Sequence, residues 1–221
     1  IYDPSANSWS AGTSLPFAYR HGKAISLNGK ILIFGGYVGN TSLEISDVRE
    51  YDPSTNNWVS KASMNTARHG HHIALHDNKV WVLGGRSLTT DYLDTVEIYD
   101  PANDSWSAGP SLTSPRHWPV AWVANGNLYV AGGKSDSSTF PDTIEAYDPS
   151  SNSWKVVGSL PSSSYAGDAA VIGDKVYLVV GHDGSSYSNK LYVADLSPVS
   201  KVAGGMNHSM VLKDDGSLWT M

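Results

Sequence analysis

Three arginine–histidine pairs are the residues of this chain whose types and spacing could do chemistry. They recur at intervals of 48 positions: Arg20-His21, Arg68-His69 and Arg116-His117. The planar guanidinium group can hold a carboxylate through two hydrogen bonds, and three imidazoles at one repeated position could line a ring for a metal ion. The next equivalent positions carry Ser164 and Tyr165, which would interrupt that ring. We therefore favour packing roles for the histidines and keep the arginines as candidate ligand contacts.

Motifs for catalysis or cofactor binding are not found in the sequence. It contains no cysteine, which excludes disulfides and thiolate chemistry in these residues. Zinc-protease, nucleophile-elbow, EF-hand and glycine-rich phosphate-binding patterns are missing as well. Histidines cluster at His69, His71, His72 and His76, and packing is again the favoured interpretation. We predict no catalytic residue, no metal ligand and no cofactor.

Composition indicates a folded, acidic protein. Hydrophobic residues make up 40% of the 221 positions and charged residues 16%, with a formal net charge of −6. This is too apolar for a disordered segment, and a nucleic-acid-binding protein would normally be basic. No apolar run approaches the roughly 18 residues of a membrane helix. The sequence therefore predicts no nucleic-acid partner and no membrane insertion.

A repeat of about 48 residues supplies the elements that must position these side chains. Tyr-Asp-Pro begins at residues 2, 51, 99 and 147, and a tryptophan follows each tyrosine by seven positions. Gly-Gly pairs stand at 35–36, 84–85 and 132–133, and the fourth equivalent is Val180-Gly181. Because all these markers share one period, the chain is built of repeated units.

Each repeat has the pattern of a four-stranded antiparallel sheet. A run of four apolar residues precedes each glycine pair, which is typical of a strand covered on both faces. Residues that favour tight turns precede each run, as at Asn28-Gly29 and Asn125-Gly126. A third strand leads into Tyr-Asp-Pro, where proline ends the ladder because it has no N–H, and a fourth carries the tryptophan. No helical periodicity is present.

These motifs resemble the kelch repeat over residues 1–196, with Arg-His-Gly, the apolar strand, Gly-Gly, Tyr-Asp-Pro and the trailing Trp in order. The resemblance implies an all-β propeller in which each sheet is one blade. We expect blades at about 19–62, 67–109, 116–158 and 165–196, with 1–13 as the tail of a preceding blade. Four blades and a partial one favour a segment of a larger ring. In the fourth blade, Ala194 stands at the tyrosine position and no tryptophan strand follows.

The resemblance also implies where a ligand would bind. In kelch propellers, the loops that enter the first strand and leave the second gather around the mouth of the channel. The predicted ligand-binding residues at these positions are Arg20, Arg68, Arg116, Tyr37, Arg86, Lys134 and His182. Five of the eight positions concerned carry Lys or Arg, which favours an acidic ligand. In the alternative interpretation, the arginines pair with carboxylates such as Asp47, Glu97 or Glu145 and hold the blades together.

A non-catalytic interaction module that binds a protein or a glycan is the function we favour. One alternative is a carbohydrate-active propeller enzyme similar to sialic-acid mutarotases, with Arg86 gripping a carboxylate. Another is a purely structural repeat segment. Ser- and Asn-rich loops with little lysine favour a secreted or cell-surface protein.

Residues 197–221 change in character and predict a second module. The segment from Lys201 to Trp219 resembles the opening of a repeat of the RCC1-type propellers. Asp214-x-Gly216-x-x-Trp219 also fits the Asp-box of sialidase-like propellers, but Leu212 stands where that motif has Ser or Thr.

Overall fold

The protein is described by a computed structural model. It describes residues 1–39, 41, 43–183 and 185–196, and the backbone of three further strands, β21 (Val199–Gly204), β22 (Ser209–Lys213) and β23 (Leu218–Thr220). The described residues form strands, turns and loops without a helix, and so none of them belongs to a helix that could cross a membrane.

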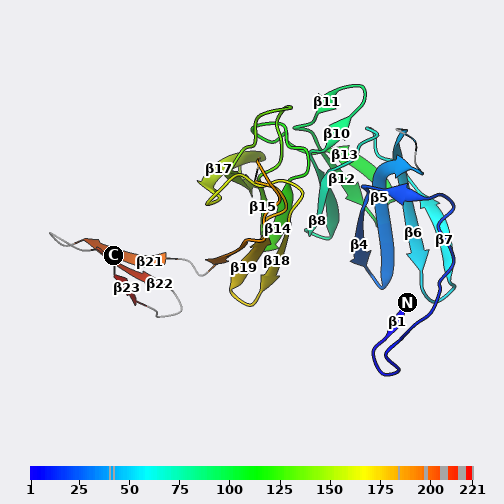
Figure 1. The fold of residues 1–221 in the computed structure, drawn as a ribbon, viewed down its shortest axis with the longest axis horizontal. Coiled ribbons are helices and arrows are strands. Elements are labelled where there is room, and N and C mark those ends of the chain that lie inside the picture. Colours follow the sequence, from blue (N-terminus) through cyan, green and yellow to red (C-terminus); the bar gives the residue numbers. More distant parts are fainter. Residues whose placement is uncertain are drawn as a thin grey trace.

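Four antiparallel sheets of successive repeats form the blades of a β-propeller (Figure 1). Blade one contains β3 (Tyr19–Arg20), β4 (Lys23–Leu27), β5 (Lys30–Val38), β6 (Glu44–Asp52) and β7 (Asn57–Lys61). Blade two contains β8 (His72–His76), β9 (Lys79–Leu83), β12 (Val96–Asp100) and β13 (Ser105–Ala108). Blade three contains β14 (Val120–Ala124), β15 (Asn127–Ala131), β16 (Thr143–Asp148) and β17 (Ser153–Ser159). Blade four contains β18 (Asp168–Ile172), β19 (Lys175–Val179) and β20 (Leu191–Asp195).

Two small hairpins lie outside these sheets. One pairs β1 (Tyr2–Asp3) with β2 (Ser8–Trp9), and the other pairs β10 (Arg86–Ser87) with β11 (Asp91–Tyr92). The strands β21, β22 and β23 form a separate antiparallel sheet. Residues 205–208, 214–217 and 221 lie outside the described residues, and the RCC1-like and Asp-box predictions fall largely on them.

The inner strands contact one another in the order β4, β8, β14, β18, as expected for blades that stand around one axis. The turns between the first and second strands of the blades adopt left-handed conformations, for example φ of +52° at Asn28 and +75° at Gly29. This is the conformation that the Asn-Gly sequence favours. The all-β propeller predicted from the sequence is therefore confirmed.

The core lies between the blades and not within any one of them. Between blades one and two it joins Phe34 and Val48 to Val80 and Tyr99, and between blades two and three it joins Trp81 to Trp154. A sheet in a propeller is covered on both faces by its neighbours, which is why each second strand contains a run of four apolar residues. The Tyr/Trp pairs of blades two and three thus each pack on the blade before them.

The glycine pairs let one blade approach the next. The first glycine has a positive φ, +61° at Gly84, and a Cβ there would lie 2.3 Å from the Arg116 carbonyl oxygen of the following blade. The second glycine donates its N–H to that same carbonyl, at 2.8 Å from Gly85. The glycine pairs therefore have a structural role, because only glycine tolerates this backbone conformation and close approach.

Candidate functional site

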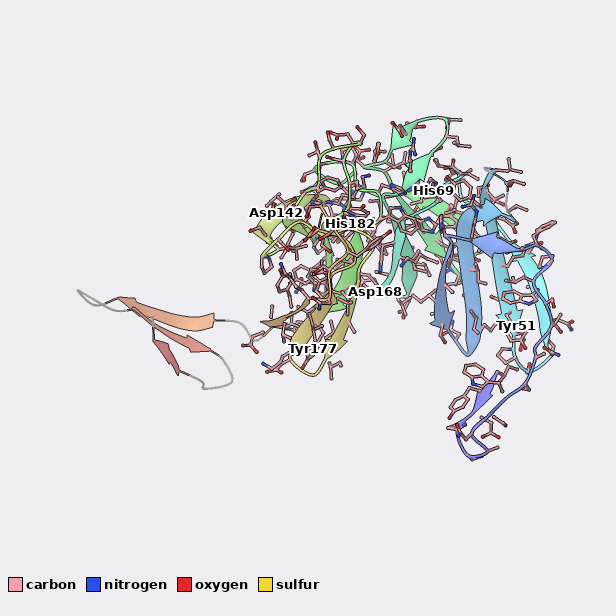
Figure 2. The ribbon with its side chains drawn as sticks, in the orientation of Figure 1. Tyr51, His69, Asp142, Asp168, Tyr177 and His182 are labelled. Atoms are coloured by element: carbon pink, nitrogen blue, oxygen red, sulfur yellow. The ribbon has the colours of Figure 1, made fainter. Side chains whose placement is uncertain are left out.

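The predicted ligand-binding residues meet on one side of the molecule, where the first strands begin. Backbone bridges join the residue that opens a blade to the one after its glycine pair: His69 to Arg86, His117 to Lys134 and Tyr165 to His182. In blade one, Arg20 pairs with Tyr37. Figure 2 shows His69 and His182 on this upper side, with Asp168 and Tyr177 lower in the molecule. We call this side the loop face.

Backbone hydrogen bonds connect the four blades around this face. Gly70 donates to the His21 carbonyl at 3.4 Å, Trp118 to the Gly70 carbonyl at 2.6 Å, and Ala166 to the Trp118 carbonyl at 3.0 Å. All four residues have a positive φ, +58° at Trp118. A bulky residue in the left-handed region is strained and persists only where its surroundings fix it. The backbone of the loop face is consequently rigid. In the sequence, only the glycine of Arg-His-Gly indicated these left-handed conformations.

Arg68 and Arg116 do not lie on the surface of this face. Both side chains are 0% exposed. The Arg68 Nη2 lies 2.7 Å from Glu97 Oε1, and the Arg116 Nη2 lies 2.7 Å from Glu145 Oε1. Direct ligand contact by these two arginines, which the sequence predicted, is therefore wrong, whereas the alternative pairing with Glu97 and Glu145 is confirmed.

Each buried arginine also binds the backbone of its own glycine pair. Arg68 donates to the Gly84 carbonyl at 2.8 Å, and Arg116 donates to the Gly132 carbonyl at 2.6 Å. Glu97 in turn accepts the N–H of Asn65 at 2.6 Å, on the connection between blades one and two. Burial lowers the pKa of Arg68, and the neighbouring Glu97 carboxylate opposes that shift. Each buried arginine–glutamate pair, with these extra hydrogen bonds, thus connects a blade to the loop that enters it.

Arg20 has different surroundings. Its side chain is exposed, donates to the carbonyls of Gly39 and Thr41 at 3.2 and 2.8 Å, and lies 4.5 Å from the centre of the Tyr37 ring. Asp47, one of the partners considered for these arginines, binds Arg49 instead, at 2.7 Å. This hydrogen bond raises the pKa of Arg49. Arg20 is thus a surface cation resting on an aromatic ring.

Two more cations stand at the edge of the loop face beside aromatic rings. Arg86 lies 5.4 Å from the centre of the Tyr92 ring, and its Nε is 2.6 Å from Asp91 Oδ1, with both side chains substantially exposed. Lys134 lies 5.3 Å from the ring centres of both Phe140 and Tyr165. No carboxylate of the described residues is within ion-pair distance of Lys134. The rings of Tyr92 and Phe140 were not identified from the sequence, because they lie at a strand end and in a loop without a repeated marker, whereas Tyr165 stands at the repeated histidine position.

Histidines and tyrosines fill the centre of the loop face. His69 Nδ1 lies 2.6 Å from Glu44 Oε1, and the Tyr37 hydroxyl is 3.1 Å from its Nε2. His117 packs edge-on against His69 at 4.8 Å between ring centres, and burial lowers the pKa of His117 to about 3. Burial likewise lowers the pKa of His69. These are neutral packing histidines, and the described residues contain no group of three or more His, Asp or Glu arranged to hold a metal ion.

His182 lies in blade four among aromatic side chains. Its ring stacks on Tyr165 at 4.7 Å and meets Tyr187 at 5.1 Å, and Tyr187 is 91% exposed. Of the seven predicted residues, the structure therefore gathers Arg20, Tyr37, Arg86, Lys134 and His182 at the loop face. Their binding of a ligand stays a prediction.

Comparison with known proteins gives similarities of sequence and of fold. Residues 1–160 match the family model described as the KLHDC2/KLHL20/DRC7 Kelch-repeats domain. Kelch-like protein 15 of Danio rerio is 35% identical over 94 residues, which are 40% of this chain and 16% of that protein. Alpha-scruin of Limulus polyphemus is 32% identical over 93 residues, 41% of this chain and 10% of that protein. The chain thus matches only a small part of these relatives.

A solved structure described as "Structure of YjhT" is similar in fold. Its TM-score is 0.65 at 20% sequence identity, and the match covers 89% of this chain and 72% of that one. At this level of identity the similarity concerns the fold alone. None of the three comparisons points to an RCC1-like repeat, so that part of the sequence interpretation stays a prediction.

Proposed function

The chain belongs to the kelch-repeat family, and from this premise we propose that it is a non-catalytic interaction module whose loop face binds a protein partner. Kelch propellers typically serve as protein-interaction modules. The supporting observation is a rigid face with aromatic and cationic side chains, of which Arg20 and Tyr187 are exposed and Tyr37, Arg86, Tyr92 and Lys134 are half-buried. Tyrosine and arginine are the residue types most enriched among those that dominate the energy of protein interfaces.

We further propose that the partner presents an acidic side chain to Lys134. The ammonium group lies beside two stacked aromatic rings and has no carboxylate partner among the described residues. Arg86, by contrast, already shares its charge with Asp91. Lys134 is therefore the cation of this face best placed to accept a new carboxylate, and Arg20 is the second.

Binding is favoured over sugar chemistry by the positions of the carboxylates. The alternative, an enzyme, would need an acid and a base at the mouth of the channel with shifted pKa values. Within the described residues, the buried carboxylates near this face have structural partners: Glu44 binds His69 and the N–H of Leu88, and Glu97 and Glu145 bind arginines. A glycan ligand has no such specific support, and we propose a protein.

Peptide selection against the whole chain tests this function. Random peptides displayed on phage would be selected on the protein, and the affinity of the selected peptides measured by fluorescence anisotropy. We expect acidic peptides whose affinity falls about tenfold or more for Lys134→Glu. The matched control is Lys79→Glu, since Lys79 is the first residue of β9, at the opposite end of the blade. Peptides that bind both variants as tightly as the unmodified protein would contradict the proposal.

A further inference from the structure

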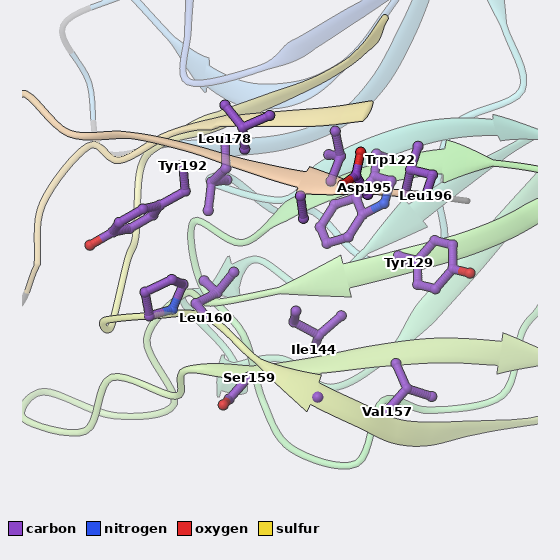
Figure 3. Close-up of a pocket in the computed structure, with 15 residues that line it drawn as sticks. Trp122, Tyr129, Ile144, Val157, Ser159, Leu160, Leu178, Tyr192, Asp195 and Leu196 are labelled. Carbon is purple, nitrogen blue, oxygen red and sulfur yellow. The ribbon is translucent and has the colours of Figure 1, made fainter. Parts of the chain in front are cut away.

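A groove lies between blades three and four. Its volume is about 410 Å³ (Figure 3). Blade three contributes Trp122, Ile144 and Leu160, and blade four contributes Val176 and Leu178. The lining is predominantly apolar, and the volume lies within the range of roughly 300–1,000 Å³ found for ligand pockets.

The corresponding space between the other blades is filled by an aromatic pair. Tyr99 and Trp106 of blade two pack against Phe34 of blade one at 5.9 and 6.0 Å. Tyr147 and Trp154 of blade three pack against Trp81 of blade two at 4.7 and 6.4 Å. In each pair the tryptophan stands directly across the ladder from the tyrosine. The same space is therefore filled by a tyrosine and a tryptophan both between blades one and two and between blades two and three.

A hydrogen bond fixes each tryptophan at the same point. The indole N–H donates to the carbonyl of Thr13 from Trp58, of Ala62 from Trp106 and of Pro110 from Trp154, at 2.9, 2.8 and 3.1 Å. These acceptors are 49 and 48 positions apart. The next position in the series is Gly158, and Gly158 lines the open groove.

Blade four leaves the groove open because, within the described residues, it has no fourth strand and carries alanine at the tyrosine position. Val80 of blade two faces Tyr99 across the ladder, and the equivalent Val176 faces Ala194. Within the described residues, β20 pairs with β19 alone, so no strand covers its outer edge. Lys201 occupies the sequence position of the tryptophan, and its strand, β21, pairs with β22.

We propose that this groove binds an extended segment of a partner protein that carries a tryptophan. The segment adds a fourth antiparallel strand to β20, with its tryptophan opposite Ala194 and the indole N–H donating to the Gly158 carbonyl. Adding a strand to an open sheet edge provides affinity through the backbone, and a pocket for one side chain provides specificity. This site is separate from the loop face, and the inference does not depend on the proposed function.

Among the described side chains, the exposed tryptophan is Trp9, and it is held elsewhere, so we commit to a segment of another protein as the occupant. Trp9 is 79% exposed in the hairpin of β1 and β2. The residues after that hairpin are fixed on blade one, where the Thr13 N–H donates to Asn56 at 2.9 Å and the Thr13 carbonyl accepts Trp58. The best template for the partner segment is the chain's own fourth strand, since that strand fills the equivalent groove.

A peptide with the sequence of residues 102–110, which includes Trp106 at its centre, provides the probe. It would be labelled with fluorescein and titrated with the whole chain, with anisotropy as the measurement. We expect saturable binding that weakens about tenfold or more when the tryptophan of the peptide is replaced by alanine. Absence of binding up to millimolar protein, or equal binding of both peptides, would overturn the inference.

Variants of the protein locate the peptide. Ala194→Glu places a charge opposite the tryptophan and is expected to weaken binding at least tenfold, whereas Ala102→Glu, in an exposed turn of blade two, leaves it unchanged. Circular dichroism checks that both variants fold, and the peptide with alanine gives the same test without altering the protein. Loss of peptide binding in Lys134→Glu would move the site to the loop face and overturn the inference. Self-association that Trp9→Ala abolishes, with peptide binding restored, would identify the occupant as the hairpin of a second copy and overturn the partner assignment.

Discussion

Blades two and three differ from blades one and four at one pair of positions. The middle blades have Arg68 with Glu97 and Arg116 with Glu145, each pair 29 residues apart and buried. At the equivalent positions, blade one has Arg20 and Arg49, and blade four has Ser164 and Tyr192. An arginine of the same sequence motif is therefore a buried connection where a glutamate stands on the third strand, and a surface cation where it does not.

The glycine pairs follow the same division. The first glycines of blades one to three lie under the backbone of the next blade, and a Cβ on any of them would be 2.3–2.7 Å from a carbonyl oxygen. In blade four this position is Val180, which is buried and has no positive φ. The first glycine of the motif is thus required by contact with the next blade. It is replaced by valine in blade four, where the described residues contain no next blade.

The largest expected effect comes from breaking a middle pair. Arg116→Ala leaves Glu145 charged and buried, and we expect the free energy of unfolding to fall by about 3–5 kcal/mol. Guanidinium chloride denaturation followed by circular dichroism measures it. Arg86→Ala is the control, because its partner Asp91 is exposed and such pairs contribute at most about 1 kcal/mol. Equal decreases in the free energy of unfolding of the two variants would show that buried and surface arginines contribute equally to stability.

The second effect concerns the close approach of the blades. In Gly84→Ala the added Cβ would meet the Arg116 carbonyl oxygen, and we expect a loss of about 2–4 kcal/mol from overpacking and left-handed strain. Gly126→Ala isolates the strain, since Gly126 has a φ of +75° and no atom within 4 Å of an added Cβ. It should lose only about 1 kcal/mol. The same denaturation experiment compares them, and a Gly84→Ala protein as stable as Gly126→Ala would contradict the contact.

The third effect depends on pH. Burial lowers the pKa of His117 to about 3, whereas an unfolded histidine titrates near 6.5. The unfolded state therefore binds the proton first, and stability decreases as the pH falls from about 6.5 towards 3. Between pH 7.5 and 5 this histidine accounts for a loss of up to about 2 kcal/mol. His117→Gln should flatten the dependence more than His21→Gln, whose ring is exposed; an unchanged slope would show that His117 is protonated in the fold.

The smallest effect sharpens the contrast within one motif. Arg20→Ala removes an exposed guanidinium that binds two loop carbonyls, and we expect less than about 1 kcal/mol. A thermal shift assay of Arg20→Ala beside Arg68→Ala makes the comparison. If Arg20→Ala were the more destabilising of the two, Arg20 would have to connect blade one to its neighbour as the buried arginines do in blades two and three.

The sequence predicted the propeller because the fold follows from local and periodic features. The turn at Asn28-Gly29, the apolar second strands and the proline after each third strand each specify backbone geometry within one repeat. The position of Ala194 in place of tyrosine was also predicted, and the pairing with Val176 confirms it. Each of these features depends on residue type and spacing alone.

Burial of the arginines could not be predicted from the Arg-His motif, because burial depends on the neighbouring blade. A usable signal was present: position 29 after the arginine is Glu in blades two and three and Arg in blade one. The frame of hydrogen bonds through Gly70, Trp118 and Ala166 had no such signal, since backbone groups of any residue can form it. Tyr92 beside Arg86 and Phe140 beside Lys134 were missed for the related reason that loops do not repeat.

A double-mutant cycle on Arg116 and Glu145 tests most directly whether the repeated arginines connect the blades. Arg116→Met, Glu145→Leu and the double variant would be unfolded with guanidinium chloride, and the coupling energy obtained from the three changes in free energy. We predict a coupling of about 2–3 kcal/mol, with the double variant more stable than either single one. Additive effects, with a coupling near zero, would contradict the account.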